Sequence, residues 1–129
     1  ATHNPVMAEV SFWMMAAGIV GALVAAPFGL VDWLAIAKDT RAKRIGAMHG
    51  GGNLVVTALF IASWLMRSAG HPPSNGAIAL GVVGALIALF TAWLGGELVA
   101  RMGVGVYDGA NLDAPNSLGE RHPEHRTSH

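Results

Sequence analysis

Cysteine is absent from this 129-residue sequence, and charged residues are scarce. Without thiols the chain can form no disulfide and can supply no thiolate ligand to zinc or to an iron–sulfur cluster. Asp, Glu, Lys and Arg together make up 12% of the residues, and their formal charges cancel to zero. The sequence therefore lacks the basic excess with which proteins bind the phosphate backbone of nucleic acids, and we expect no nucleic-acid partner.

Motifs that would indicate an enzyme are also missing. The glycine-containing stretch 103–107 follows an apolar run rather than a strand and contains no lysine, so it does not resemble a phosphate-binding loop. No Ser, His and Asp pattern typical of a nucleophile with its base stands out. We therefore expect no catalytic residues and no enzymatic activity.

The chain does contain three long apolar runs without Asp, Glu, Lys or Arg, namely Val10–Val31, Ile45–Met66 and Gly76–Gly96. They are 22, 22 and 21 residues long, and a membrane-spanning helix needs about 20 such residues. A chain of this size cannot cover three such runs with polar surface. The sequence therefore predicts an all-α membrane protein. We expect a three-helix transmembrane domain over residues 1–106, with spans at about 8–37, 45–68 and 76–101, and a polar tail over residues 107–129.

Lysine and arginine are distributed unequally between the two ends of the predicted spans. Only Arg67 lies near the second connection. The other seven lie in the first connection or after the third span: Lys38, Arg41, Lys43, Arg44, Arg101, Arg121 and Arg126. Because such residues accumulate on the cytoplasmic side, we predict a multi-pass membrane protein with its N-terminus outside and its C-terminus cytoplasmic. The tail has no apolar period and would be disordered alone, so we expect a partner to hold it.

Small residues recur at every fourth position on two of the runs. The positions are Ala17, Gly21, Ala25 and Gly29 on the first run and Gly84, Ala88, Ala92 and Gly96 on the third. Hydrophobicity does not drive association inside lipid, and small residues allow helix backbones to approach closely. We therefore expect both stripes to pack against a helix, either of this chain or of another.

A few polar residues lie within the spans, where ionisable groups are energetically expensive and mark function. Asp32, His49 and Glu97 lie six, five and four residues from the nearest basic residue at the predicted cytoplasmic boundary. At about 1.5 Å per residue they share one depth on three successive helices. Asn53 and Thr57 continue the polar face of His49. We expect Asp32, His49 and Glu97 to converge inside the bundle, with at least two of them linked directly or through water.

This polar cluster has three interpretations. The groups can bond one another and hold the helices in register. Alternatively, His49 can be an axial ligand of haem or another flat macrocycle, because Gly50–Gly52 let a ring approach the backbone, or the cluster can hold a quinone head group. The third interpretation is proton or cation handling. Two carboxylates and one imidazole are a weak metal signature, so we predict no metal site, and we expect His122, His125 and His129 to be solvated or bound to a partner.

Three segments of the chain occur in an order and spacing that resemble a known family. They are Gly29–Trp33, Arg44–His49 with Asn53, and Trp93–Val99 leading into Gly103–Val106. Together they resemble the bacterial membrane family catalogued as domain of unknown function 2231, over about Ala16 to Val106. Its members are small helical membrane proteins, and in some the module is joined to a Rieske-type iron–sulfur domain. The resemblance therefore implies a place in the bacterial inner membrane and service near quinone or respiratory electron transfer.

The resemblance also implies which positions matter. Asp32, His49 and Asn53 fall on positions that recur in the family, whereas Glu97 stands where many relatives carry histidine. The family usually begins with a further helix that opens with His-Pro and His-Phe-Pro patterns, and nothing in this sequence matches that helix. We therefore expect three helices of a four-helix module, with the missing packing surface supplied by another subunit.

From these features we expect a small accessory or structural subunit of a larger bacterial membrane complex that serves electron transfer, either respiratory or photosynthetic. One alternative is a module that binds haem, another macrocycle or quinone at His49, with Asp32, Glu97 and Asn53 around it. A further alternative is proton or cation handling. The expected partners are other membrane subunits, the lipid bilayer and a pigment or quinone.

Overall fold

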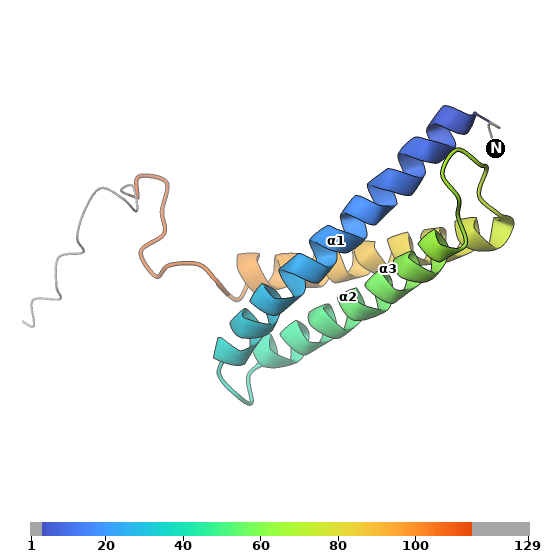
Figure 1. Cartoon of the computed structure of the whole chain (residues 1–129). Helices are drawn as coiled ribbons and strands as arrows, with labels where there is room; N and C mark the ends of the chain where they lie inside the picture. The colour runs from blue at the N-terminus through green and yellow to red at the C-terminus, as the bar shows by residue number, and fades with distance from the viewer. Residues whose placement is uncertain (1–3, 115–129) are drawn as a thin grey trace, which may run out of the picture.

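The computed structural model describes residues 4–114, which fold into three helices. These are α1 (Pro5–Ala35), α2 (Arg41–Leu65) and α3 (Asn75–Ala100), shown in Figure 1. Each helix is long and apolar enough to cross a membrane, which confirms the prediction of an all-α, multi-pass membrane protein. The orientation of the helices between the two sides of the membrane stays a prediction. Most of the predicted tail, with its three histidines, lies outside the described residues.

Each helix begins at a polar capping residue rather than at the first apolar residue of its run. The capping hydrogen bonds run from a backbone N–H to a side-chain oxygen: Val6 to Asn4 (3.0 Å), Lys43 to Thr40 (3.1 Å) and Ala77 to Ser74 (3.2 Å). Such side chains satisfy donors that the first turn of a helix leaves free. As a result, the helices begin one to four residues before the predicted spans begin, and they end one to three residues before the predicted spans end.

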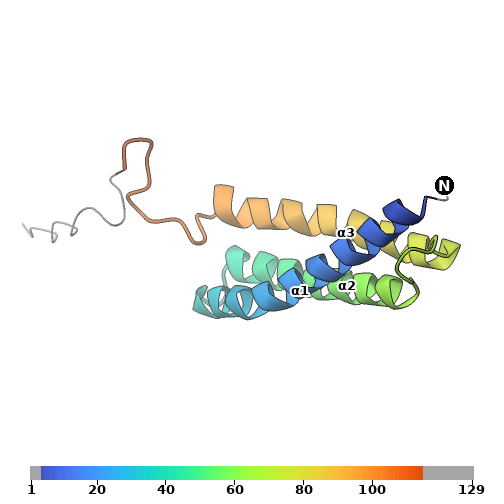
Figure 2. The ribbon, with the colours of Figure 1, turned by 45° about the horizontal axis from the view of Figure 1, so that its top comes forward.

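α2 and α3 lie against each other along their length, whereas α1 packs on α2, and α1 and α3 are apart at their C-terminal ends (Figure 2). Buried residues of α3 recur every seven positions at Ala77, Gly84, Thr91 and Leu98. The matching positions on α2 are His49, Val56 and Ser63, which are also seven residues apart. A seven-residue repeat keeps one face of each helix turned toward its partner. The α2–α3 contact is therefore a continuous seam of mostly small residues.

Most positions of the two predicted four-residue stripes do not pack within this chain, so their contact with a helix of another chain stays a prediction. Only Gly84 of the eight is buried, and Leu59 and Phe60 of α2 lie 3.5 Å from the place of its missing Cβ. Four residues advance a helix by about 40° more than a full turn. A four-residue stripe therefore winds away from the contact face, and at Gly96 the missing Cβ faces open space.

α1 contacts α2 near both of its ends through aromatic side chains. Trp33 Nε1 donates to the carbonyl oxygen of Lys43 at 3.0 Å, and Lys43 Nζ donates to the carbonyl oxygen of Trp33 at 2.6 Å. The same Nζ lies 4.0 Å from the centroid of the Trp33 ring. Toward the start of α1, Phe12 stacks on Trp64 of α2 with the ring centroids 5.1 Å apart. Between these two contacts a cavity separates α1 from α2.

Gly52 provides a test of the α2–α3 seam, because a Cβ at this position would overlap the methyl group of Thr91. We expect Gly52→Ala to lower the free energy of unfolding by about 1–3 kcal/mol, the range typical of overpacking. Gly51→Ala is the matched control, since open space surrounds its missing Cβ and alanine favours a helix over glycine by about 1 kcal/mol. Unfolding in detergent micelles, followed by circular dichroism, measures both variants. Equal midpoints for the two would contradict the packing described.

Candidate functional site

A groove of about 1950 Å³ lies between α1 and the α2–α3 pair. Its wall on α1 extends from Ser11 to Ala35, and most of its surface is apolar. The polar side chains that line it are Ser11, Asp32, Thr40, His49, Asn53 and Thr57. The groove thus contains three of the four residues that the sequence selects as a site, and Glu97 is not among its lining residues.

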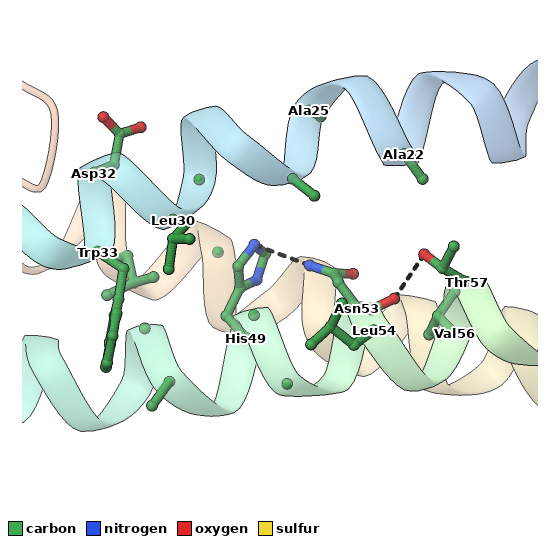
Figure 3. A pocket seen from close by; sticks show the side chains of 18 of the residues that line it. Ala22, Ala25, Leu30, Asp32, Trp33, His49, Asn53, Leu54, Val56 and Thr57 are labelled. Atoms are coloured by element: carbon green, nitrogen blue, oxygen red, sulfur yellow. Dashed lines mark hydrogen bonds between the residues drawn. The ribbon is translucent and has the colours of Figure 1, made fainter.

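His49 points from α2 into the groove (Figure 3). Its imidazole ring makes two hydrogen bonds, of which Figure 3 shows the one to Asn53. Nδ1 lies 2.8 Å from the carbonyl oxygen of Thr91 on α3, and Nε2 lies 3.1 Å from Nδ2 of Asn53. A carbonyl oxygen can only accept, so Nδ1 carries the proton of the ring. An amide nitrogen can only donate, so Nε2 accepts. Both ring nitrogens of His49 therefore have partners within the chain.

Asn53 and Thr91 complete this hydrogen-bonded group across the two helices. The hydroxyl of Thr91 lies 3.0 Å from Asn53 Oδ1 and 3.0 Å from the carbonyl oxygen of Ala88. When it donates to Asn53, the amide turns its NH₂ toward His49. Hydrogen bonds between membrane helices contribute about 0.6 kcal/mol on average and up to ~1.7 kcal/mol. The group made of His49, Asn53 and Thr91, which we name the interhelical polar group, thus fastens α2 to α3.

The ring of His49 also needs the glycine that faces it on α3. A Cβ on Gly95 would lie 2.9 Å from His49 Cε1 and 3.3 Å from Nδ1. A Cβ at these distances would clash with the ring, and the ring cannot move away without losing its two hydrogen bonds. Gly95 therefore makes room for the imidazole, whereas its neighbour Gly96 has open space around the corresponding position.

Asp32 lines the same groove but does not join His49. Its carboxylate points away from the imidazole ring in Figure 3, and its side chain is exposed. It makes no hydrogen bond or ion pair with any residue between positions 4 and 114. Asp32 precedes Trp33 by one residue, which is about 100° around the helix. Because Trp33 faces α2, the preceding side chain is turned away from it.

Glu97 is paired with arginines rather than with histidine. Its carboxylate lies 3.4 Å from Nη2 of Arg41 and 3.0 Å from Nε of Arg101. Glu97 follows Gly95 by two residues, about 200° around α3, so it does not share the face that meets His49. The predicted direct link between at least two of Asp32, His49 and Glu97 is therefore absent from the described residues. Equal depth does not place side chains on one face.

The structure brings His49 together with Asn53, as the sequence suggested, and adds Thr91, which sequence reasoning missed. A signal for Thr91 existed, because it lies seven residues after Gly84 and seven before Leu98. Within residues 4–114, no three His, Asp or Glu side chains are grouped closely enough to hold a metal ion. The arrangement is chemically a neutral hydrogen-bonded group at the edge of an apolar groove.

Comparison with known proteins identifies a family for the helical part of the chain. Residues 1–108 match the sequence model of a family described as predicted membrane protein (DUF2231). This confirms the resemblance carried by the three segments and extends it from about Ala16 to the first residue. No curated protein and no solved structure matches the chain. The match includes all of α1, α2 and α3.

A double-mutant cycle tests the interhelical polar group. We expect His49→Leu and Asn53→Leu each to lower the free energy of unfolding by about 1–3 kcal/mol, because each leaves a polar partner unsatisfied. The double variant should lose less than the sum, with a coupling of about 0.5–1.5 kcal/mol. Thr57→Val is the control, since the Thr57 hydroxyl bonds only a carbonyl of its own helix. Its effect should add to that of His49→Leu within about 0.5 kcal/mol. Additivity of the first pair, measured by unfolding in micelles, would show that the group is not coupled.

Proposed function

This chain belongs to the DUF2231 family of predicted membrane proteins, and we propose that it is an accessory subunit, without enzymatic activity, of a larger bacterial membrane complex. The observation that supports this proposal is the groove between α1 and the α2–α3 pair. In this proposal the groove receives a transmembrane helix of another subunit. The N-terminus of α1 lies outside and the end of α3 lies toward the cytoplasm of the inner membrane, as the lysine and arginine distribution indicates.

The walls of the groove favour a helix as its occupant. On α1 the lining includes Gly18, Ala22, Ala25 and Gly29, and open space surrounds the missing Cβ of both glycines. The wall on α2 presents Gly50, which also has open space around it. Small residues on opposite walls let another helix bring its backbone close to both, which is the usual way that helices associate in lipid.

The polar residues of the groove favour protein over lipid as the occupant. His49, Asn53 and Thr57 form one row along α2, and the exposed carboxylate of Asp32 is on α1. Acyl chains offer no hydrogen-bonding partner, and polar groups that face hydrocarbon are energetically expensive. The row already bonds within the chain, so a helix with small or hydroxyl side chains can pack against it without leaving a polar atom unsatisfied.

The link to electron transfer is supported by the family resemblance, in which some relatives join this module to a Rieske-type iron–sulfur domain. A respiratory or photosynthetic complex would supply both the neighbouring helices and a pigment or quinone close to this subunit. Proposed partners are therefore other membrane subunits of such a complex and the surrounding bilayer.

Site-specific photo-cross-linking tests the occupant of the groove. We expect a photoreactive phenylalanine at position 22, which replaces the groove-lining Ala22, to form one discrete adduct with another polypeptide in membranes of a bacterium that encodes this chain. Position 24 is the matched control, because Val24 is 61% exposed on the same helix and does not line the groove. Mass spectrometry identifies the adducts. Adducts with lipid alone from position 22, or the same polypeptide captured equally from both positions, would contradict the proposal.

A second function, the binding of haem, another macrocycle or quinone, is favoured by the orientation of His49. Histidines that bind a metal through one nitrogen usually donate the other N–H to a carbonyl or carboxylate, and Nδ1 of His49 already donates to Thr91. The ring points into the groove beside Gly50. Asn53 holds Nε2 at 3.1 Å and would have to release it to a metal. Glu97 takes no part in this candidate site, since it is paired with two arginines.

Absorption spectra before and after reduction test the haem form of this second function. If His49 is an axial ligand, protein purified from haem-replete cells shows a Soret band, and His49→Ala removes it. His71→Ala is the control, because His71 is exposed in the connection between α2 and α3. Asn53→Ala should raise haem occupancy, since it frees Nε2. A protein without a Soret band, or a band that survives His49→Ala, would rule out this ligand.

A further inference from the structure

A basic cluster lies at the end of the molecule where α1 ends, α2 begins and α3 ends. It consists of four exposed residues, Lys38, Arg41, Arg44 and Arg101, and Glu97 lies between two of them. Glu97 Oε2 is 3.4 Å from Arg41 Nη2, and Glu97 Oε1 is 3.0 Å from Arg101 Nε. The Glu97 side chain is 15% exposed, whereas those of Arg41 and Arg101 are 60% and 74% exposed. One carboxylate thus holds guanidinium groups from two helices, and we name these three residues the arginine clamp.

Within residues 4–114, the arginine clamp leaves most of its hydrogen-bond donors unused. A guanidinium group has five N–H donors. Arg41 donates to Glu97 through Nη2, and Arg101 is held to Glu97 as an ion pair. One carboxylate neutralises only one of the two guanidinium charges. Lys38 and Arg44 form no ion pair within the described part of the chain. The exposed donors therefore suit an anion with several oxygen acceptors, which guanidinium groups bind through paired hydrogen bonds.

The position of the arginine clamp along the helices indicates which anion it meets. Arg41 precedes the apolar run that begins at Ile45 by four residues, and Arg101 follows the run that ends at Gly96 by five. At about 1.5 Å per residue, both lie roughly 6–8 Å beyond the apolar runs. The head-group layer of a bilayer extends about 5–8 Å beyond each face of the hydrocarbon core. The clamp therefore lies at the level of phospholipid phosphates.

We propose that the arginine clamp binds the phosphate of an anionic phospholipid. Glu97 is a positioning residue here, because it sets the spacing and direction of the two guanidinium groups without contacting the phosphate. The general attraction of basic residues to anionic lipids needs charge but no fixed geometry. The clamp residues do not line the groove, so this site is independent of what occupies it.

Native mass spectrometry of the full chain in detergent, with phosphatidylglycerol or phosphatidylcholine added, measures the binding. We expect the unmodified chain to bind phosphatidylglycerol about tenfold more tightly than phosphatidylcholine, and Arg41→Gln or Arg101→Gln to remove most of that preference. Arg44→Gln is the matched control, since it removes an exposed arginine from the same end of α2 without touching Glu97. An equal loss with Arg44→Gln would overturn the proposal in favour of charge attraction alone.

Glu97→Gln separates geometry from charge. This change makes the basic end more positive, so charge attraction alone would strengthen phosphatidylglycerol binding. We expect weaker binding, because the two guanidinium groups lose their common anchor, and a gain would overturn the proposal. Glu97→Asp keeps the charge but shortens its reach, and it is expected to weaken binding as well. Circular dichroism in the same detergent checks that each variant keeps its helices.

Inorganic phosphate distinguishes the lipid from a free anion. We expect millimolar phosphate to leave the binding of phosphatidylglycerol to the unmodified chain unchanged, because the acyl chains hold the lipid against the apolar helices. Displacement of the lipid by phosphate, with the same dependence on Arg41 and Arg101, would make free phosphate the ligand and overturn the lipid assignment.

Discussion

Close contact between α2 and α3 holds this molecule together, because burial of apolar side chains does not drive helices to associate inside lipid. The contact forms where side chains are smallest, at Gly52 against Thr91 and at Gly95 against His49. These approaches bring the polar atoms of His49, Asn53 and Thr91 within hydrogen-bonding distance. Without water in the hydrocarbon, each polar atom must find its partner in protein. The small residues along the seam therefore allow the helices to approach closely, and this approach allows the hydrogen bonds between them to form.

α1 is attached by a different and weaker means. Trp33 and Lys43 fix its C-terminal end, and Phe12 with Trp64 fixes the opposite end. Only Ala8 is buried among its 31 residues. The part of the molecule that bounds the groove is thus the part with the fewest contacts to the rest of the chain, and a partner helix can add packing there without disturbing the seam.

The helices could be predicted from the sequence because membrane spans depend on length and composition, which a charge-free run displays directly. The partners of individual polar residues could not be predicted in the same way. Depth follows from counting residues to the nearest lysine or arginine, but direction around the helix axis does not. Asp32, His49 and Glu97 share a depth, yet His49 faces α3, Glu97 faces two arginines and Asp32 faces away from both helices. The seven-residue spacing of Thr91 from Gly84 identifies Thr91 as part of the contact face only once the matching positions on α2 are known.

The aromatic contacts at the two ends of α1 also determine the shape of the groove. Trp33 sits against Gly46, where even a methyl group would lie 2.8 Å from its ring, and Trp64 lies under Phe12 at the other end. These bulky rings act as spacers, so their size sets the width of the opening. Smaller residues at the same places would let α1 settle onto α2 and narrow the groove while the α2–α3 seam stayed as it is. Changes at these two aromatic contacts can therefore resize the groove without rebuilding the α2–α3 seam.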